Sequence, residues 1–326
     1  MSRIQSHTTD LVPGAIVNRD FAVEMLVGRG AFSSVYRATQ RSRRDRPVAL
    51  KVLHRGIQNL IEQEAGRVRN PYMKEQLLCQ RLKDPAVCRV VKVGTTEEGR
   101  YFVALEWAHG VTLDLYLRDH KAGVPFFLAA SVADQLGRAL TEMHGNRVIH
   151  RDIKPSNIML QDISGGAAKV KILDFGIAKL GGEDDGVTRE DEILVGTPAY
   201  MSPEQAAGRI TDPRSDVFSL GAVIYEMLTG KRHIQIDKRT GDDYVRYLTS
   251  REAIPTLPLR SLRPEVPPET EAAVHRALSR DWNLRPRVIE ELLTDVVTPL
   301  YALAPSSNDE GGVFRRAWEA VVRRIR

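Results

Sequence analysis

The chain has 326 residues, of which 42% are hydrophobic and 27% charged, the composition of an ordinary soluble globular protein with one or two domains. Its net charge of +5 is mild, and no basic stretch is interleaved with aromatic residues, so no nucleic-acid partner is expected. Cys79 and Cys88 form no disulfide framework, and no apolar run reaches the roughly 18 residues of a membrane span. We therefore expect packed thiols, no transmembrane segment and a cytoplasmic setting.

The first hundred residues carry the signals of five short strands, because runs rich in Val, Tyr or Phe are separated by turns. One helix is expected among them, with Asn70 as N-cap and Pro71 in its first turn. Its apolar residues at helical spacing are Met73, Leu77, Leu78 and Leu82. This pattern predicts a small antiparallel lobe with strands at 21–27, 34–39, 47–53, 89–95 and 101–107.

After Gly110 the apolar residues recur at intervals of three and four, which is typical of helices. The segment 255–268 carries five prolines and is expected to be ordered but not helical. A change of pattern near 108–111 indicates a hinge, and a cleft between two lobes is a favoured place for a ligand. The helices are expected at 125–144, 213–229, 240–250, 268–279 and 286–297.

The amphipathic tail 313–326 reads VFRRAWEAVVRRIR, with an apolar face opposite five arginines. It predicts either a helix docked on the larger lobe or a helix (312–326) that contacts a partner or a membrane surface.

Two features of the first lobe indicate a polyphosphate ligand. Gly28 and Gly30 lie between two strands, where glycine lets backbone N–H groups approach phosphate oxygens, although such a turn is often only a hairpin. Lys51 lies in the apolar strand VALKVL, and burying a lone ammonium is costly, so it needs an anion unless it reaches solvent at a sheet edge. Glu75 in the predicted helix is the favoured carboxylate, and Glu62 and Glu64 compete with it.

The segment HRDIKPSNIML, residues 150–160, crowds polar groups between apolar flanks, which predicts a half-buried site where each group has a partner. Asp152 is the candidate base that orients an attacking hydroxyl. Lys154 can neutralise negative charge on a transferring phosphoryl group. Asn157 and Asp174, the latter after the apolar strand of VKILDFG, offer the hard oxygen ligands that Mg²⁺ prefers.

Three further assignments are regulatory or structural. Thr188, in the acidic stretch GGEDDGVTREDEI, is a candidate phosphosite that Arg151 can pair with. Glu204 is expected to open a helix, with Arg285 as its buried partner. Asp216 is expected to cap backbone N–H groups beneath the loop at 150–157.

Over residues 20–297 these ordered motifs resemble the protein kinases, and among them the eukaryotic-like serine/threonine kinases of bacteria. Lys154 in HRDIKPSN and Thr197 in GTPAY are the features similar to the Ser/Thr rather than the Tyr enzymes. The resemblance implies an α+β, bilobal protein kinase fold, with a small β-rich N-lobe with one helix and a larger, mainly α-helical C-lobe. It implies an N-terminal extension at 1–19, lobes at 20–108 and 109–298, and a C-terminal extension at 299–326.

The same resemblance implies an ATP-dependent enzyme that uses Mg²⁺, with Mn²⁺ as an alternative ion. Its product would be phosphorylated Ser or Thr on protein substrates, with autophosphorylation of its own activation loop. Asp152 would be the base, Asn157 and Asp174 the metal ligands, and Leu105 the gatekeeper. The residues implied to contact the nucleotide are Gly28, Gly30, Ser33, Val35, Ala49, Lys51, Glu75, Leu105, Glu106 and Ala108.

Three departures from the family pattern stand out. Ser33 replaces the third glycine of the loop, and Ser202 stands where alanine usually precedes Pro-Glu. The interval from Lys51 to Glu75 is longer than is typical, so an extra segment near 55–66 precedes the helix. The rival hypotheses are a nucleotide-binding pseudokinase scaffold and a small-molecule phosphotransferase of related fold. The intact set of Lys51, Asp152, Asn157 and Asp174 argues against the first hypothesis. The segment GTPAYMSPE argues against the second, because in the family it serves to hold a peptide substrate.

Overall fold

The computed structural model forms two compact units that divide between Ala108 and His109. The first unit contains residues up to Lys83 and the segment Val87–Ala108, and the second contains Asp84–Ala86 and the chain from His109 to Asp174 and from 198 onward. The residues that the structure describes are 10–30, 32–65, 76–164, 167–174, 198–234, 246–250 and 256–303.

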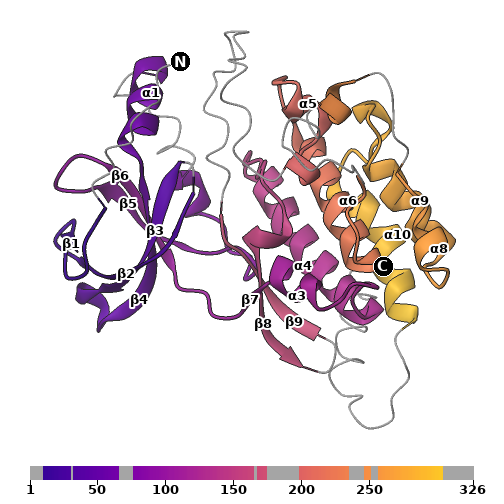
Figure 1. Ribbon diagram of the computed structural model, residues 1–326, viewed down its shortest axis with the longest axis horizontal. Helices are drawn as coiled ribbons and strands as arrows, with labels where there is room; N and C mark the ends of the chain where they lie inside the picture. The colour runs from indigo at the N-terminus through magenta and orange to yellow at the C-terminus, as the bar shows by residue number, and fades with distance from the viewer. Residues whose placement is uncertain are drawn as a thin grey trace. The chain divides into compact units, whose positions relative to one another are not determined.

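The first unit is built on an antiparallel sheet with the strand order β1-β2-β3-β4-β6-β5 (Figure 1). All five predicted strands are confirmed. An additional strand, β1, pairs with β2 and brings residues 16 and 17, which were expected to precede the lobe, into its sheet. The strands are β1 (Ile16–Val17), β2 (Phe21–Arg29), β3 (Ser33–Gln40), β4 (Arg46–Leu53), β5 (Val90–Thr95) and β6 (Tyr101–Glu106).

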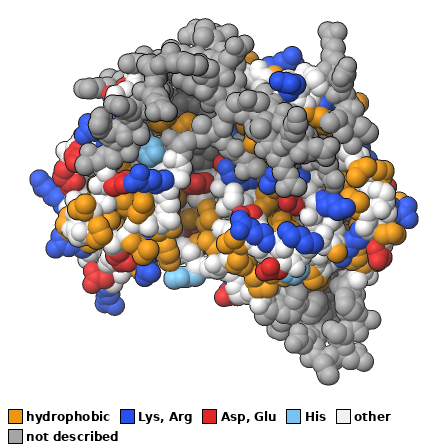
Figure 2. All heavy atoms as spheres, viewed as in Figure 1, with side chains coloured by type: hydrophobic (Ala, Val, Ile, Leu, Met, Phe, Trp, Pro, Cys, Tyr) orange, Lys and Arg blue, Asp and Glu red, His pale blue; other side chains and the backbone are white. Residues whose placement is uncertain are grey.

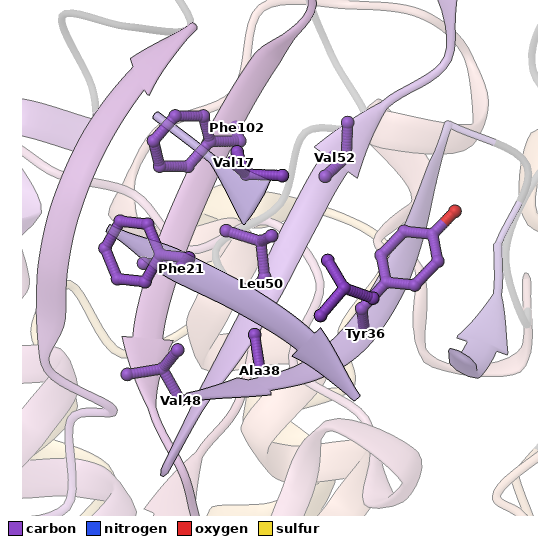
Figure 3. Close-up of a cluster of buried hydrophobic side chains, with 10 residues drawn as sticks. Val17, Phe21, Tyr36, Ala38, Val48, Leu50, Val52 and Phe102 are labelled. Atoms are coloured by element: carbon purple, nitrogen blue, oxygen red, sulfur yellow. The ribbon is translucent and has the colours of Figure 1, made fainter. Parts of the chain in front are cut away.

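The core of this unit lies on one face of the sheet, because alternate residues of a strand point to the same side. Figure 3 shows side chains from β1, β2, β3, β4 and β6 converging there. The rings of Phe21 and Phe102 meet edge to face with their centroids 5.7 Å apart. The buried members of the cluster are Val17, Phe21, Val23, Tyr36, Ala38, Val48, Leu50, Val52, Phe102 and Ala104.

The helices of the first unit differ from the prediction of a single helix. Helix α1 (Arg55–Ala65) forms within the segment expected only as an insertion. Gln58 ties it to the β5–β6 hairpin, donating to the Gly99 carbonyl at 2.8 Å and accepting from the Tyr101 N–H at 2.9 Å. Glu62 accepts from the Tyr101 hydroxyl at 2.8 Å. These polar contacts stabilise α1 on a hairpin some 40 residues away in the chain.

The helix predicted to begin at Asn70 is helical over residues 76–79, and its start lies outside the described residues. Leu77, one of the apolar residues at helical spacing, is 52% exposed, whereas Cys79 and Leu82 are buried. Of the predicted apolar positions, Leu82 is thus buried and Leu77 is not. Cys79 and Cys88 are both free and buried, as expected.

The second unit is mainly helical (Figure 1). The helices predicted at 125–144, 213–229 and 268–279 are confirmed within two residues at each end, and residues 246–249 of the one predicted at 240–250 are helical. The helices are α3 (Leu113–Arg118), α4 (Phe126–Gly145), α5 (Pro203–Ala206), α6 (Pro213–Thr229), α8 (Leu259–Leu262), α9 (Pro268–Ala277) and α10 (Ile289–Ala302).

Helix α10 was predicted at 286–297 but begins three residues later and continues past Pro299 to Ala302. The expected lobe boundary at 298 therefore falls inside a helix. Proline lacks the N–H that would bond the carbonyl of the residue four positions earlier. The Thr270 hydroxyl donates to that Asp295 carbonyl at 3.0 Å instead, so a tertiary contact replaces the missing helical bond.

The proline-rich segment expected to be free of helix contains α8, which starts directly after Pro258. Pro258 is the N-cap of α8 and precedes its first helical residue, so its missing N–H removes no hydrogen bond of the helix. The prediction was wrong because the prolines were taken as evidence against helix along the whole segment.

A small sheet with the order β7-β8-β9 positions the polar loop of the second unit. Its strands are β7 (Val111–Thr112), β8 (Ile158–Ser164) and β9 (Ala167–Ile172). The Gln135 side chain on α4 donates to the Ala168 carbonyl at 2.8 Å and accepts from the Val170 N–H at 3.0 Å. Helix α4 thereby fixes the strand that leads to Asp174.

The described surface mixes charges of both signs. On the face drawn in Figure 2, basic and acidic side chains lie next to one another among apolar ones. Within the described ranges, no helix combines the length and the apolar composition that a bilayer crossing needs.

Candidate active site

The loop from His150 to Asn157 is held by its backbone against α6. Asp216, in the first turn of α6, accepts from the N–H groups of His150 and Arg151, both at 2.8 Å. Arg151 adopts a left-handed conformation with φ of 64°, which turns the two N–H groups toward the carboxylate. The prediction that Asp216 caps N–H groups beneath the loop is confirmed.

Asp216 is fully buried, and His144 at the end of α4 also donates to it, at 2.8 Å. Burial alone would raise the pKa of Asp216, but the hydrogen bond and charge of His144 and the loop N–H groups lower it. The carboxylate is thus ionised and bridges α4, α6 and the loop. Sequence reasoning missed His144, because nothing in the local pattern distinguishes it from an exposed histidine near a helix end.

His150 is fully buried, and burial lowers its pKa despite the nearby carboxylates of Asp216 and Asp152. Its Nδ1 accepts from the Asp152 N–H at 3.2 Å, so this nitrogen carries no proton. A neutral His150 therefore fixes the backbone of the candidate base, Asp152, itself.

Asp152, Lys154 and Asn157 come together as the sequence predicted. The Lys154 ammonium and the Asn157 Nδ2 each donate to Oδ2 of Asp152 at 2.8 Å. Asn157 Nδ2 also lies 2.9 Å from the Asp152 carbonyl. One oxygen of the carboxylate is thereby oriented by two donors.

Asn157 and Asp174 are brought to neighbouring positions by the β8–β9 ladder. Ile158 pairs with Ile172, and the Asn157 carbonyl accepts from the Leu173 N–H at 2.8 Å. Asp174 follows one residue later and is half-buried. Because Asn157 Nδ2 faces Asp152, its side-chain oxygen points elsewhere and retains its capacity as an acceptor or ligand.

The predicted pair of Glu204 and Arg285 is confirmed. The guanidinium donates from both terminal nitrogens, at 2.8 and 2.9 Å, to the two carboxylate oxygens. Burial alone would raise the pKa of Glu204, but Arg285 and the Ser215 hydroxyl lower it to about 2. Both side chains are buried, and the pair joins α5 to the segment that precedes α10.

Helix α5 carries a second support for the loop that the sequence analysis did not recognise. Ser202 and Gln205 form a reciprocal capping box at its start. The Gln205 amide also donates to the Arg151 carbonyl at 2.8 Å. The Ser-x-x-Gln spacing was a readable signal of the cap, but not of the contact with the loop. The departure at Ser202 from the family pattern thus has a structural role.

In the first unit, Lys51 lies on β4 between Val35 of β3 and Val103 of β6, and it is only 8% exposed. It is therefore a central-strand lysine and not one at a sheet edge. Glu75, its predicted partner, lies outside the described residues.

The glycine turn joins β2 to β3. Gly28 pairs with Val35, and the Gly30 N–H donates to the carbonyl of Ser33 at 2.8 Å. That N–H is engaged in closing the hairpin. Ser33, at the place of the usual third glycine, is buried at the start of β3.

The remaining positions assigned to the nucleotide lie on β4, on β6 and at the end of the first unit. Ala49 pairs with Leu105, which is buried. The Glu106 N–H donates to the Arg89 carbonyl at 2.9 Å, and the Glu106 carbonyl lies 3.5 Å from the Cys88 sulfur. Ala108 is the last residue of the segment Val87–Ala108.

Some predicted features lie outside the described residues. They are the phosphosite Thr188, Thr197 of the GTPAY motif and the tail at 312–326.

Comparison with known proteins identifies the family. A model described as the protein kinase domain matches residues 21–297. A Myxococcus xanthus protein, "Serine/threonine-protein kinase pkn3", is 35% identical over 285 residues, which are 86% of this chain and 50% of that protein. A Lactococcus lactis protein, "Probable serine/threonine-protein kinase PknB", is 31% identical over 274 residues, 83% of this chain and 40% of that protein. The chain therefore spans about half or less of the length of these relatives.

The same fold occurs in a solved structure, the kinase domain of Mycobacterium tuberculosis PknI. It superposes with a TM-score of 0.67 at 21% identity, over 89% of this chain and 100% of that one. With the family match over most of its length, the chain belongs to the protein kinase domain family.

Proposed function

We propose that the chain is a serine/threonine protein kinase that transfers the γ-phosphoryl group of Mg-ATP to hydroxyl groups of proteins. Protein kinases as a family use ATP with a divalent metal ion. The observation that carries the proposal is the Asp152 carboxylate, oriented through Oδ2 by Lys154 and Asn157. Its other oxygen, Oδ1, is the one that would accept a substrate hydroxyl and later its proton.

Lys154 has a second task in this proposal. Its side chain is 15% exposed and its ammonium lies against the base, so the ammonium can also contact a phosphoryl group that approaches the same hydroxyl. A fixed cation at this point stabilises negative charge as it develops, and it does so without reorganising in the transition state.

The residues available for the metal fit Mg²⁺. The Asn157 amide oxygen and the Asp174 carboxylate are hard oxygen donors, and neighbouring strands hold them. Mg²⁺ is usually bound by one or two protein oxygens, with phosphate and water completing an octahedron. The metal would supply charge neutralisation for the phosphates, while Asn157 also keeps the base in place.

In the first unit, Lys51 is proposed to bind the α- and β-phosphates, with Glu75 as its ion-pair partner. Its position on a central strand supports this, because a buried ammonium requires compensating negative charge. Around the nucleotide, the backbone of the turn at Gly28 and Gly30 would cover the phosphates, with Ser33 and Val35 following it. Ala49 and Leu105 would line the adenine site, with backbone groups of Glu106 and Ala108 bonding its edge.

Activation is proposed to involve phosphorylation of Thr188, by this chain or by another copy of it. The supporting observation is the position of Arg151, whose backbone is fixed by Asp216 and Gln205 while its Nε lies 3.3 Å from the Thr211 hydroxyl. A phosphate is a stronger acceptor than a hydroxyl and would displace that contact. The tail at 312–326 is proposed to dock on the larger lobe, or to contact a partner or membrane surface.

The activity is tested with purified chain, radiolabelled ATP, Mg²⁺ and a generic basic protein. Asp152→Asn is expected to lower label incorporation by at least a hundredfold. Asp162→Asn, which removes an exposed carboxylate of β8, is the matched control and should leave the rate unchanged. Label that persists undiminished in Asp152→Asn would exclude this base, and a wild-type chain that binds ATP without transferring phosphate would favour the pseudokinase alternative.

A further inference from the structure

The turn between β3 and β4 carries an unusual concentration of arginine. Four of its six residues, Arg41, Arg43, Arg44 and Arg46, are basic, and Asp45 brings the net charge of the turn to +3. The first three arginines are exposed, and the fourth is half-buried. Within the described part of the chain, none of the four guanidinium groups forms an ion pair. We call residues 41–46 the arginine turn.

Hydrogen bonds to Asp20 hold the arginine turn in one conformation. The Asp20 carboxylate accepts from the Ser42 N–H at 2.9 Å and from the Gln40 side chain at 3.0 Å. The Asp20 carbonyl accepts from the Arg41 N–H at 2.9 Å, and Gln40 pairs with Arg46 across the hairpin. The charge of Asp20 is thus directed at backbone and amide groups of the turn, so it fixes the turn without neutralising its arginines.

The backbone of the turn is strained where it carries two of its charged side chains. Arg44 has φ of 51° and ψ of 48°, and Asp45 has φ of 53°. This left-handed region disfavours residues with a Cβ, and glycine would fit it better. Arg44 ends the short 3-10 helix at 41–43, a position where a left-handed residue is common but is usually glycine or asparagine. The helix end therefore explains the conformation, and it does not explain the choice of arginine.

The chemistry of the turn indicates a compact anion with several oxygens. All of its basic residues are arginines, whose planar guanidinium binds phosphate or carboxylate through two parallel hydrogen bonds, whereas lysine acts as a point charge. The basic surface is also small. Arg37, which precedes the turn on β3, already forms an ion pair with Glu24, with 2.8 Å between Nε and the carboxylate oxygen. A footprint of one turn fits a short segment better than the extended phosphate backbone of a nucleic acid or a lipid surface.

We propose that the arginine turn is a docking site for a short acidic segment of a protein that carries a phosphorylated residue. The fixed backbone reduces the conformational entropy lost on binding, so that only the side chains must be ordered. The site is separate from the proposed phosphoryl transfer, and its test requires neither ATP nor activity.

The probe is a labelled peptide with the sequence of residues 181–194, which contains six carboxylates and Thr188, synthesised with and without phosphate on that threonine. Binding to the full chain without nucleotide is followed by fluorescence anisotropy. We expect the phosphorylated peptide to bind at least tenfold more tightly than the other form. The triple variant R41Q/R43Q/R44Q should weaken that binding at least tenfold.

The matched control is R209Q/R260Q/R287Q, which removes the same charge from exposed arginines of the second unit and should change the affinity less than twofold. A second variant, R41K/R43K/R44K, keeps the charge but loses the paired hydrogen bonds, and it should also lower the affinity for the phosphorylated peptide. Unchanged affinity in the glutamine variant would overturn the proposal. Vesicles with 30% anionic lipid and duplex DNA are tested as alternative ligands. If the phosphopeptide does not bind, but vesicles or DNA bind the wild-type chain and R41K/R43K/R44K equally well and R41Q/R43Q/R44Q less well, the proposal would be replaced by a membrane or nucleic-acid surface.

Discussion

The ion pair between Glu204 and Arg285 offers a sharp test of how the second unit is stabilised. The substitution Arg285→Met keeps the bulk of the side chain and removes its charge. It leaves the Glu204 carboxylate, 7% exposed, with the Ser215 hydroxyl at 2.6 Å as its remaining side-chain donor. The loss is larger than that of two hydrogen bonds, because a buried charge then lacks compensation.

The magnitude follows from two independent routes. Removing one partner of a buried ion pair typically destabilises a protein by about 3–5 kcal/mol. The lowering of the Glu204 pKa from its ordinary value of 4.5 to about 2 corresponds to about 3 kcal/mol of stabilisation at neutral pH. Since the folded pKa is below the unfolded one, this contribution is fully present above about pH 5 and is lost as the pH falls toward about 2.

The assay is urea unfolding followed by circular dichroism at pH 7 and at intervals down to pH 3. Arg285→Met is expected to lower the free energy of unfolding by about 3 kcal/mol at pH 7 and by clearly less at pH 3, where protonated Glu204 tolerates the loss better. The control is Arg276→Met, which breaks a 2.7 Å pair with Asp295 whose side chains are 52% and 39% exposed. It should have an effect below about 1 kcal/mol.

Equal effects of the two substitutions at pH 7 would refute the reasoning, because they would mean that burial adds nothing to the pair. A loss in Arg285→Met that does not shrink at low pH would also contradict it, since the penalty would then not come from an uncompensated carboxylate. The double variant with Glu204→Gln should recover a large part of the loss.

Two smaller predictions concern single groups in the fold. Thr270→Val, on α9, removes the donor that replaces the missing N–H of Pro299 in α10, so it should reduce the free energy of unfolding by about 1–2 kcal/mol. The control Thr294→Val, on the exposed side of α10, should reduce it by less than half of that in parallel urea titrations. Gly123→Ala should lower the melting temperature by much more than Gly99→Ala does. Both glycines have positive φ, but of the two only Gly123 would place a Cβ 2.2 Å from a backbone oxygen. Similar melting curves for the two variants would contradict this steric argument.

The strands and long helices could be predicted from sequence because their signals are local. Alternation along β2, β3 and β4 places Phe21, Tyr36 and Leu50 on one face whatever the rest of the chain does. Helix α1 carried such a signal too, with Ile57, Leu60 and Ile61 at helical spacing, but the stronger start signal at Asn70 and Pro71 drew the prediction to the later segment.

In the candidate site, residue types and their order predicted which groups come together. Asp152, Lys154 and Asn157 lie within six residues, and the contacts among them follow once the loop is short and half-buried. The pair of Glu204 and Arg285 was also predictable across 81 residues, because a buried carboxylate leaves few alternatives to arginine.

The sequence by itself therefore determined five strands of the first unit, the long helices α4, α6 and α9, the polar loop and the residues that need charged partners. Tertiary structure alone decided that His144 bonds Asp216, that Gln205 bonds the Arg151 carbonyl, and that Thr270 completes α10. Periodicity and charge are constrained by neighbours a few positions away, so they can be read along the chain. A neutral amide, hydroxyl or imidazole can bond to almost any backbone group, and only the packing of distant segments selects which one it meets.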